Sequence, residues 1–591
     1  MIKFDLFLLM NSLPTKGCPL FTTGSLNNLN RLSLSINDIL IITILIINIV
    51  KTKIEVDNVD YIMKKVFLGL LFVLTGVLLL LPVLDTTNVY GVDELPNEPI
   101  VKLGNEVLFS EDYYHLVRNK DVGLITNQTG INSKGESTVD VLAEDDDVNL
   151  KALYTPEHGL DGVARAGEYV ESYTHEELDI PVYSLYGATR EPTEEMLEEV
   201  EVLLFDIQDI GARTYTYIST LNYSMVAGEK YDTPVIILDR PNILGGITVE
   251  GPVLEEEFIS FVGVDKLPKA HGMTVGEITK FFNREINADI EVVPMSGYQR
   301  NMIFQDTGLP WQQTSPNIPE FDSSFKYMAT GLGEGTGVYQ SDYFNWIGGN
   351  GLDAEEFAQA LNDSDLKGVE FEPEYKGEAG GVNLNIYDYH RFNPARTGIH
   401  ALTNAFKLGD FQVPKSDLEN NYVVMFDKIM GTDKIGKWLD EGLAPEEIES
   451  NYSGTLEEFK EKREQYLLDK YEVEVMVRVD DAPISFDSEP YIDDNDRLMV
   501  PLRAISEALG AQVGWDESSR RVTIIKENDE INFTIDDSTA YLNGEAKEMD
   551  TNPVIRNDRT MLPARYVSEY LGADVDWLED WEIVNIDLNL R

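Results

Sequence analysis

Side chains of catalytic type gather in a few short segments of this sequence. The segment YTPEHGLDG places Glu157 beside His158, after a proline and before a glycine. The segment FDIQDIGARTYTY carries two more acids, Asp206 and Asp209. Hydrolysis of a glycosidic bond uses two carboxyl groups, one that donates a proton and one that acts as base or nucleophile. We therefore predict that Glu157 is the general acid and base, and that Asp209, or Asp206, is its partner.

Two arginines lie close to these acids in the sequence. Arginine binds carboxylates through two parallel hydrogen bonds, so Arg213 and Arg240 are candidates for binding an acidic group of a substrate. The alternative is that each arginine pairs with its neighbouring aspartate, Asp209 or Asp239, and only holds its loop. The other residues that we expect to bind substrate are Asn127, Gln208, Tyr215, Tyr217, Asn242, Glu250, His271, Asn317 and Glu334.

Metal and nucleotide chemistry are less favoured by the sequence. His158, Asp206, Asp209 and His271 would make a mixed nitrogen and oxygen metal site, but the chain has no HExxH or similar paired-histidine spacing. We therefore expect no metal and no cofactor, and we expect both histidines to position substrate. A serine nucleophile in a G-x-S-x-G turn is absent. The glycine-rich GLGEGTG does not follow a first strand, as a dinucleotide site requires.

The candidate residues follow short apolar segments that are typical of buried parallel strands. In open α/β sheets, ligands bind at the carboxyl ends of the strands. We therefore predict an α/β fold with a Rossmann-like parallel-sheet domain over residues 105–255, followed by a second, α+β subdomain over residues 256–472. The apolar segments are DVGLIT, VNLKALYT, EVLLFD and TPVIILD, and STLNYSMVAGEKY is one of the helices expected between them.

The last part of the chain, residues 474–591, contains an internal repeat. The stretches that begin at Arg497 and Arg559 match at eleven of nineteen positions with an offset of 62. Each unit is predicted to be a strand, a short amphipathic helix and a strand that carries Trp515 or Trp577. This small α+β repeat module resembles the copper amine oxidase N-terminal-like stalk domain. It has no histidine or cysteine to bind copper. We expect the tryptophans to pack in its core; stacking on sugars is the alternative.

The motifs of the main part resemble, in order, those of the NamZ-type exo-β-N-acetylmuramidases. They are GLITNQTG, TPEHGLDG, PVYSLYG, FDIQDIGARTYTYIST, LDRPNILGG, VEGPVL, HGMTVGE and GVNLNIYD. The resemblance implies release of terminal N-acetylmuramic acid from the non-reducing end of peptidoglycan fragments, in a cleft between two subdomains. The family's P-E-H-G glutamate falls on Glu157, and its F-D-x-Q-D acids fall on Asp206 and Asp209. The lactyl carboxylate of muramic acid would suit Arg213 or Arg240.

Net charge and the N-terminal region restrict the partners and the location. With 104 acidic and 47 basic residues the formal charge is −57, which argues against nucleic acid as a partner. Two lysines follow Met63 and precede an apolar run that ends at Leu84, so we predict a signal peptide over residues 63–91. An uncleaved anchor is the alternative. Residues 1–62 are interpreted as an upstream segment outside the true protein.

These features predict an extracellular or wall-associated hydrolase that acts on peptidoglycan-derived muro-oligosaccharides, with the C-terminal module as a contact to the cell wall. Two other functions stay open at this level. One is a wall-binding protein without catalytic activity. The other is a metal-dependent esterase or amidase that uses the same cleft.

Overall fold

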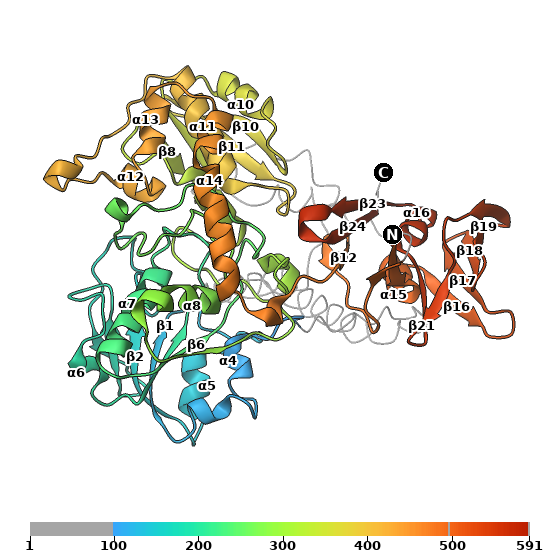
Figure 1. Ribbon diagram of the computed structural model, residues 1–591, viewed down its shortest axis with the longest axis horizontal. Coiled ribbons are helices and arrows are strands. Elements are labelled where there is room, and N and C mark those ends of the chain that lie inside the picture. The colour runs from blue at the N-terminus through green and yellow to red at the C-terminus, as the bar shows by residue number, and fades with distance from the viewer. Residues whose placement is uncertain (1–98, 494–496, 589–591) are drawn as a thin grey trace, which may run out of the picture. The chain divides into compact units, whose positions relative to one another are not determined.

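A computed structural model of the protein describes residues 99–493 and 497–588. The predicted signal peptide and the segment before it lie outside the described residues. Within the described part, no helix is both long and apolar enough to cross a membrane. The description below follows the chain from its first sheet to the C-terminal module (Figure 1).

The first subdomain is built on a seven-stranded sheet with the strand order β3-β4-β2-β1-β5-β6-β7. All neighbouring strands are parallel except β3, which pairs antiparallel with β4. The strands are β1 (Asp121–Thr126), β2 (Asn149–Thr155), β3 (Tyr173–Thr174), β4 (Pro181–Ser184), β5 (Val202–Asp206), β6 (Val235–Leu238) and β7 (Ile290–Val293). The helices are α4 (Gly104–Val107), α5 (Thr138–Glu144), α6 (Glu194–Leu197), α7 (Tyr217–Lys230) and α8 (Val275–Ile286).

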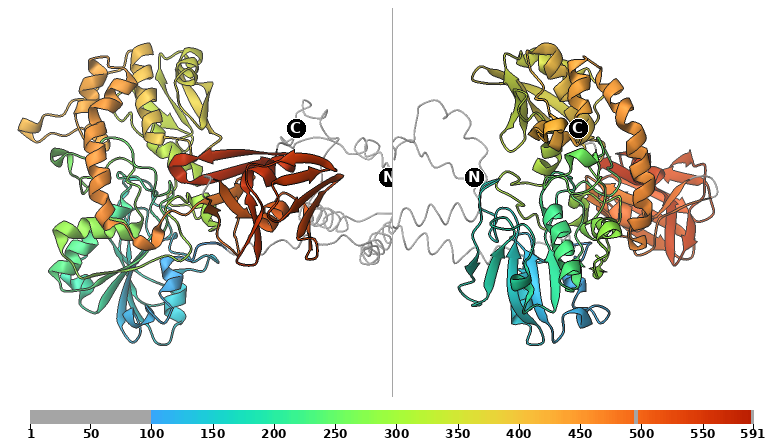
Figure 2. Two further views of the ribbon diagram at one scale, coloured as in Figure 1. Left: turned by 45° about the vertical axis from the view of Figure 1, so that its right-hand side comes forward. Right: turned by 60° about the vertical axis from the view of Figure 1, so that its left-hand side comes forward.

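Both faces of this sheet are covered, which explains the nearly continuous apolar runs of its strands. Successive strand residues point to opposite faces. Leu124 of β1 belongs to the core that contains Leu142 of α5, whereas its neighbour Ile125 belongs to the core that contains Leu221 of α7. The left view of Figure 2 shows helices on both sides of this sheet. The parallel sheet predicted from the sequence is therefore present, with helices on its two faces.

The order of the parallel strands determines where a ligand site is expected. From β1 the chain moves outward through β2 to β4, then returns to place β5 on the other side of β1. Such a reversal opens a crevice at the carboxyl ends of the strands. The sheet also continues past the boundary predicted at residues 255–256, because β7 pairs in parallel with β6. That boundary needs correction: the first subdomain extends at least to Val293.

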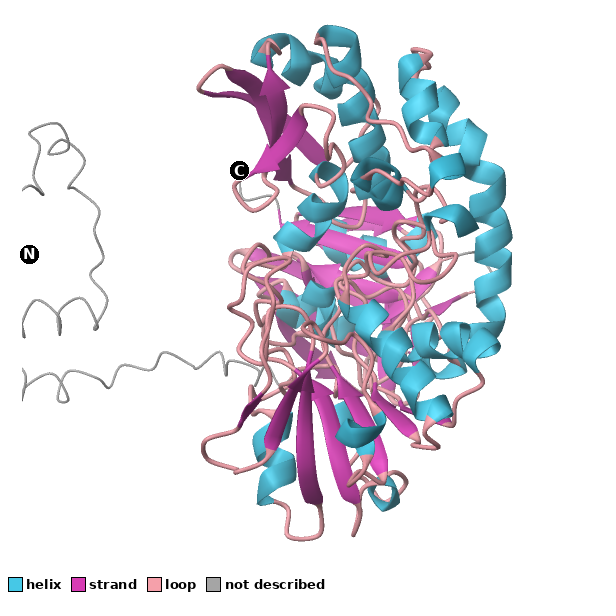
Figure 3. Ribbon diagram, turned by 90° about the vertical axis from the view of Figure 1, so that its left-hand side faces the viewer, coloured by secondary structure: helices cyan, strands magenta, loops and turns pink. Residues whose placement is uncertain are grey.

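The second subdomain combines an antiparallel sheet, in the order β10-β11-β9-β8, with several helices, as the predicted α+β class requires. Its strands are β8 (Val338–Ser341), β9 (Trp346–Asn350), β10 (Val369–Lys376) and β11 (Ala379–Ile386). Its helices are α9 (Asp322–Thr330), α10 (Ala354–Asn362), α11 (Pro394–Leu408), α12 (Met425–Met430), α13 (Lys434–Asp440) and α14 (Pro445–Arg463). Figure 3 shows many loops gathered between this subdomain and the strands of the first sheet.

In its described residues, the C-terminal module contains three small sheets and two α-helices. Its strands are β12 (Met476–Val479), β13 (Ala482–Pro483), β14 (Tyr491–Ile492), β15 (Leu498–Pro501), β16 (Gln512–Asp516), β17 (Arg521–Lys526), β18 (Asp529–Thr534), β19 (Thr539–Leu542), β20 (Glu545–Glu548), β21 (Val554–Arg556), β22 (Arg559–Pro563), β23 (Ala573–Leu578) and β24 (Ile583–Leu588). Its helices are α15 (Leu502–Ala508) and α16 (Ala564–Tyr570). The predicted repeat is present as β15-α15-β16 and β22-α16-β23.

The two repeated tryptophans correct one expectation. Trp515 is 43% exposed and Trp577 is 44% exposed, so neither is a core residue. They lie on β16 and β23, which are edge strands of their sheets, where one side has no neighbouring strand to cover them. Core packing of these rings was therefore the wrong expectation, and their rings are available to other molecules.

A buried polar network joins the module to the preceding subdomains. The guanidinium of Arg478 on β12 contacts the Asp306 carboxylate, with 3.3 Å between Nε and Oδ1. Arg478 also donates to Nδ1 of His390 at 3.1 Å, and His390 Nε2 lies 2.9 Å from Asp306 Oδ2. Trp581 packs edge-on against the His390 ring. All four side chains are buried. Such a network fixes partners in one arrangement, since each charge needs the others.

Candidate active site

Glu157 lies in the loop that follows β2 and is held by two donors. Its Oε1 accepts a hydrogen bond from the Gly167 N–H at 2.8 Å, and its Oε2 accepts one from the Thr216 hydroxyl at 2.6 Å. The side chain is only 8% exposed. Burial, and after it the charge and hydrogen bond of Glu157, raise the pKa of the adjacent Tyr186 phenol. The carboxyl group of Glu157 is thus fixed in orientation at the carboxyl end of the sheet.

His158 shapes this loop. Its backbone has a φ of 75°, an unusual value for a residue other than glycine. Its ring Nδ1 lies 2.7 Å from the carbonyl oxygen of Ala164, which closes the loop on itself. The sequence placed His158 among the catalytic residues as a group that positions substrate; the structure gives its ring a contact to its own loop.

Asp209 is the second acid at this edge and follows β5. Its Oδ2 accepts from the Gly211 N–H at 2.7 Å, while Oδ1 has no hydrogen-bond partner within the described residues. Burial raises the pKa of Asp209 to about 7, against the lowering effect of the backbone donors. The carboxyl group can therefore hold a proton near neutral pH.

His271 stands beside Asp209, with 3.9 Å between its Nε2 and the Asp209 Oδ2. Burial, followed by the charge of Arg463, lowers the pKa of His271 to about 3, so the ring is neutral. Its Nδ1 accepts from the Met273 N–H at 3.3 Å, which places the ring proton on Nε2, toward Asp209. The predicted residue His271 thus belongs to the same site as Asp209.

Two buried basic side chains, Lys269 and Arg213, lie near Tyr327, as the acids do, and neither has a carboxylate partner within the described residues. Lys269 is 1% exposed, and its Nζ has no hydrogen-bond partner in the described part of the chain. Arg213 is also 1% exposed; it donates to the carbonyl oxygen of Ile429 at 2.8 Å, but its Nε and Nη1 have no partner there. Burial, and then the charge of Arg213, lower the pKa of Lys269 well below its usual value. Burial lowers the pKa of Arg213 to about 10.

Tyr327 of α9 lies between the acids and the cations. Its hydroxyl is 3.0 Å from the Thr214 hydroxyl, and Lys269 Nζ is 6.0 Å from its ring centre. Burial chiefly, and also the charges of Glu157 and Asp209, raise its pKa to about 12. Glu157, Asp209, Arg213, Lys269 and Tyr327 are called the buried polar cluster below.

Tyr215 and Tyr217, predicted from the sequence, form one wall of the cluster. Their rings meet edge to face with centres 4.8 Å apart, and Tyr215 also packs edge-on against Tyr327. Tyr215 donates to the hydroxyl of Thr314 at 3.0 Å, and Tyr217 donates to the Thr314 carbonyl. Burial raises the pKa of both phenols, so they stay neutral donors.

Asp206 has a different position from Asp209, although three residues separate them. Its Oδ1 pairs with Arg240 Nε at 2.5 Å, and its Oδ2 accepts from the Thr138 hydroxyl at 2.6 Å. Arg240 is buried as well and also donates to the carbonyl of Ile131. Arg240 thus pairs with Asp206 of the neighbouring strand, not with Asp239 as the alternative interpretation held. This pair links the carboxyl ends of β5 and β6, and each charge has a partner within the protein.

Three other predicted residues organise loops. Asn127 accepts from the N–H and hydroxyl of Thr129 at 2.9 and 2.6 Å. Gln208 donates to the carbonyl of Pro241 at 2.7 Å. Asn242 donates to a backbone carbonyl of the loop before α8 at 3.0 Å. Their side-chain amides thus hold the loops that follow the strands in place.

The remaining predicted residues are not part of the buried polar cluster. Asn317 and Glu334 have exposed side chains. Glu250 is half-buried and lines a separate cavity. Among the described residues, no group of three or more His, Cys, Asp or Glu side chains is arranged to hold a metal ion.

Sequence reasoning missed three residues of the site: Lys269, Thr216 and Tyr327. Lys269 precedes His271 in the segment KAHG, and a lysine beside a candidate histidine in so acidic a chain was a usable signal. Thr216 stands between the two tyrosines that were predicted. Tyr327 comes from α9 in the second subdomain, and no local motif marks it.

Comparisons with known proteins show the family of this chain. Residues 122–322 match the family model "Exo-beta-N-acetylmuramidase NamZ, N-terminal", and residues 325–468 match the corresponding C-terminal model. The peptidoglycan beta-N-acetylmuramidase NamZ of Bacillus subtilis (strain 168) is 40% identical over 391 residues, which cover 64% of this chain and 93% of that protein. The chain belongs to the NamZ family. It is a glycoside hydrolase, so the alternative of a wall-binding protein without catalytic activity is wrong.

A solved structure and a third family model complete the comparison. A crystal structure of a DUF1343 family protein from Bacteroides fragilis NCTC 9343 has a TM-score of 0.55 and 33% identity, covering 62% of this chain and 98% of that one. Residues 478–586 match the model "Copper amine oxidase N-terminal domain". The resemblances to the NamZ family and to this stalk-type domain, inferred from the motifs, are thus confirmed.

Proposed function

We propose that this NamZ-family protein is an exo-β-N-acetylmuramidase that releases terminal N-acetylmuramic acid from the non-reducing end of peptidoglycan fragments. The observation that carries the proposal is the buried polar cluster, in which two carboxyl groups and two basic groups without a carboxylate partner lie near Tyr327. The name of the Bacillus subtilis relative, a peptidoglycan beta-N-acetylmuramidase, supports the same reaction.

Glu157 and Asp209 are the proposed carboxyl pair. Asp209, whose pKa burial raises to about 7, holds the proton that the leaving sugar oxygen needs. Glu157, which accepts a hydrogen bond at each oxygen, acts as base or nucleophile. This assignment gives Asp209 the donor role that the sequence had suggested for Glu157. It leaves Asp206 out of the reaction.

Arg213 and Lys269 are proposed to bind the lactyl carboxylate of muramic acid. Burial lowers the pKa of both basic groups, and an entering carboxylate would stabilise the protonated form of each side chain. Arg213 retains the role considered for it from the sequence, Lys269 joins it, and Arg240 does not share it because Asp206 occupies its guanidinium. N-acetylglucosamine, which lacks the lactyl group, would leave both cations unpaired.

Secretion is part of the proposal and rests on the sequence alone. The lysines and apolar run that follow Met63 have the layout of a signal peptide. Peptidoglycan lies outside the cytoplasmic membrane, so an exported enzyme meets its substrate there. Size analysis of the protein recovered from the culture medium would test this; retention of all protein in the cytosol would contradict it.

The decisive experiment uses a disaccharide of N-acetylmuramic acid β-1,4-linked to N-acetylglucosamine. The expected products are the two free monosaccharides, identified by mass spectrometry. An isomer with N-acetylglucosamine at the non-reducing end should remain intact. Cleavage of the isomer alone, or loss of activity on chelation of metal ions, would overturn the proposal and favour the metal-dependent alternative.

A further inference from the structure

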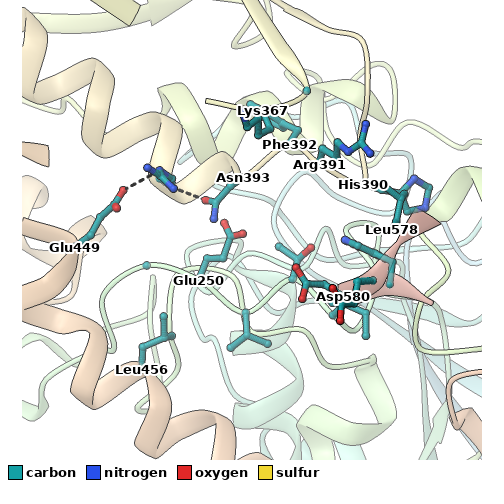
Figure 4. A pocket seen from close by; sticks show the side chains of 18 of the residues that line it. Glu250, Lys367, His390, Arg391, Phe392, Asn393, Glu449, Leu456, Leu578 and Asp580 are labelled. Atoms are coloured by element: carbon teal, nitrogen blue, oxygen red, sulfur yellow. Dashed lines mark hydrogen bonds and ion pairs between the residues drawn. The ribbon is translucent and has the colours of Figure 1, made fainter. Parts of the chain in front are cut away.

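A second cavity lies apart from the buried polar cluster. It has a volume of about 1060 Å³, within the range of ligand sites. Its walls come from the loop at residues 247–251, the segment at residues 387–396, one face of α14 and residues 577–581 of the C-terminal module (Figure 4). Leu578 and Trp581 of that last segment belong to the same apolar core as the first two subdomains. The cavity wall from the module is therefore anchored.

Two exposed aromatic rings line this cavity. Tyr387 is 66% exposed and Trp577 is 44% exposed. Exposed aromatic rings beside polar groups are typical of binding surfaces, since they offer an apolar face next to hydrogen-bonding atoms. Trp515 occupies the same place in the first repeat and is equally exposed, but it is not one of the lining residues. The repeat thus provides two matched tryptophans, of which one borders a cavity.

The basic groups of the cavity are paired with carboxylates of the cavity or of near neighbours. Each of its four lysines and arginines has a carboxylate partner. The pairs are Lys367 with Asp365, Arg391 with Asp576, Arg396 with Glu449, and Lys460 with Glu457. Glu579 and Asp580 are exposed at the cavity and would repel an anion. This differs from the buried polar cluster, where two cations lack partners.

Glu250 adds a hydrogen-bonding group on the cavity wall. Burial raises its pKa to about 8, so at neutral pH the group is mostly an uncharged carboxylic acid that can both donate and accept. Its Oε2 is 3.4 Å from the Ala395 N–H that donates to it. Paired basic groups, a neutral acid and exposed rings together favour a ligand without negative charge, rich in hydroxyl or amide groups and with apolar faces.

We propose that this cavity is an accessory site for a stretch of uncharged amino-sugar oligosaccharide, distinct from the site where the bond is cleaved. A pyranose ring has an apolar face for Trp577 and Tyr387 and equatorial hydroxyls for the surrounding polar groups. The inference that the oligosaccharide comes from peptidoglycan rests on the proposed function. The inference that the cavity binds an uncharged sugar chain rests only on the residues that line it. The sequence had assigned Glu250 to the substrate site, and here it binds sugar at a different place.

The cavity and the buried polar cluster share a backbone wall. Glu250 forms a bridge with Ala270, and Ala270 forms another with Ala212. Lys269 and His271 flank Ala270 and belong to the site of cleavage. A glycan held in the cavity would thus be bound beside the backbone segment that carries Lys269 and His271. Such binding would slow dissociation of the enzyme from its polymer.

The test compares Trp577→Ala with Trp515→Ala in the full protein. The probe is chitotetraose, an uncharged oligosaccharide of N-acetylglucosamine, titrated calorimetrically. We expect wild type and Trp515→Ala to bind equally and Trp577→Ala to bind at least about tenfold more weakly. Turnover of a small aryl muramide should be the same in all three. Equal chitotetraose affinity in both variants, or no binding to wild type, would overturn the inference.

A second variant covers the case in which Trp577→Ala perturbs folding. Tyr387→Ala removes the other exposed aromatic ring of the cavity, which comes from the second subdomain. It should also weaken chitotetraose binding, while aryl muramide turnover stays at the wild-type rate. Unchanged binding in Tyr387→Ala together with slowed turnover in Trp577→Ala would refute the site. If wild type binds chitotetraose through Trp577 but does not cleave the aryl muramide, the proposed function fails and the accessory site stands.

Discussion

Two groups of acids lie at the carboxyl edge of the same sheet, and their surroundings differ. Asp206 is fully buried, paired with Arg240 and bonded to Thr138. Asp239 is equally buried and accepts from Thr274, Gly276 and Tyr471. These acids have their hydrogen-bonding capacity met by the protein.

The second group, Glu157 and Asp209, lies among polar atoms without partners, although Glu157 itself accepts a hydrogen bond at each oxygen. Asp209 Oδ1, Lys269 Nζ and two nitrogens of Arg213 lack partners within the described residues. Protein interiors rarely leave buried polar atoms unpaired, so such a concentration marks a place that a ligand completes. The comparison teaches that an acid after a strand is no evidence of catalysis by itself; what matters is whether unpaired polar groups lie around it.

The largest effect is expected from Glu157→Gln. Loss of the carboxylate should lower kcat by about 10³-fold, because a positioned acid–base group contributes roughly 10²–10⁴-fold. The thermal midpoint should stay close to that of wild type, since the amide keeps the size of the side chain. Rates on the muramic acid disaccharide and a thermal melt measure both. Glu171→Gln, an exposed acid of the same loop, is the control and should retain full activity.

Asp209→Asn is expected to come next and to depend on the leaving group. Without its proton donor the enzyme should lose about 10²-fold or more on the disaccharide, but much less on an aryl muramide whose leaving group needs no proton. The wild-type rate on the disaccharide should fall as pH rises through about 7, because Asp209 is protonated below its pKa and deprotonated above it. Equal losses on both substrates would assign Asp209 another role.

Lys269→Met should change specificity rather than chemistry. Removing one hydrogen bond to a carboxylate costs roughly 1.5–3 kcal/mol, so kcat/KM for the aryl muramide should fall by about 10- to 100-fold. The already poor rate on the matching aryl N-acetylglucosaminide should hardly change, since that sugar has no lactyl group. Lys266→Met, an exposed lysine of the same loop, serves as control. An unaltered ratio between the two substrates would remove Lys269 from lactyl recognition.

The smallest effect on catalysis is expected from Asp206→Asn, which acts on stability. Leaving Arg240 buried without its partner should lower the free energy of unfolding by about 3–5 kcal/mol. The protein that remains folded should turn over substrate at a rate near wild type. Urea unfolding and active-site titration separate the two quantities. A variant as stable as wild type but inactive would place Asp206 in the reaction and break the comparison.

Much of the first sheet could be predicted from the sequence, because its buried strands are continuous apolar runs. The segments that became β1, β2, β5 and β6 were recognised, and so were the acids that follow two of them. The partner of Arg240 was not predicted. Asp206 comes from a neighbouring strand, and only the order of the strands in the sheet brings the two side chains together.

The site was predictable in part for the same reason. Glu157, Asp209, Arg213 and His271 stand in local motifs, whereas Tyr327 reaches the cluster from a helix of the other subdomain. The exposure of Trp577 could not be read from its apolar neighbours either, because it depends on β23 being the last strand of its sheet. Local pattern predicts which residues are polar or apolar; it does not predict which partners the fold supplies.

The buried arginine of β12 limits how the C-terminal module can be exchanged between proteins. Grafted onto another enzyme body, the module would bring Arg478 with it, and that body would have to offer an aspartate and a histidine where Asp306 and His390 stand here. In a host without them, Arg478 would be buried without a partner. The free-energy cost would be a large part of the folding stability of many domains. Exchange of this module is therefore restricted to proteins that already carry the matching aspartate and histidine.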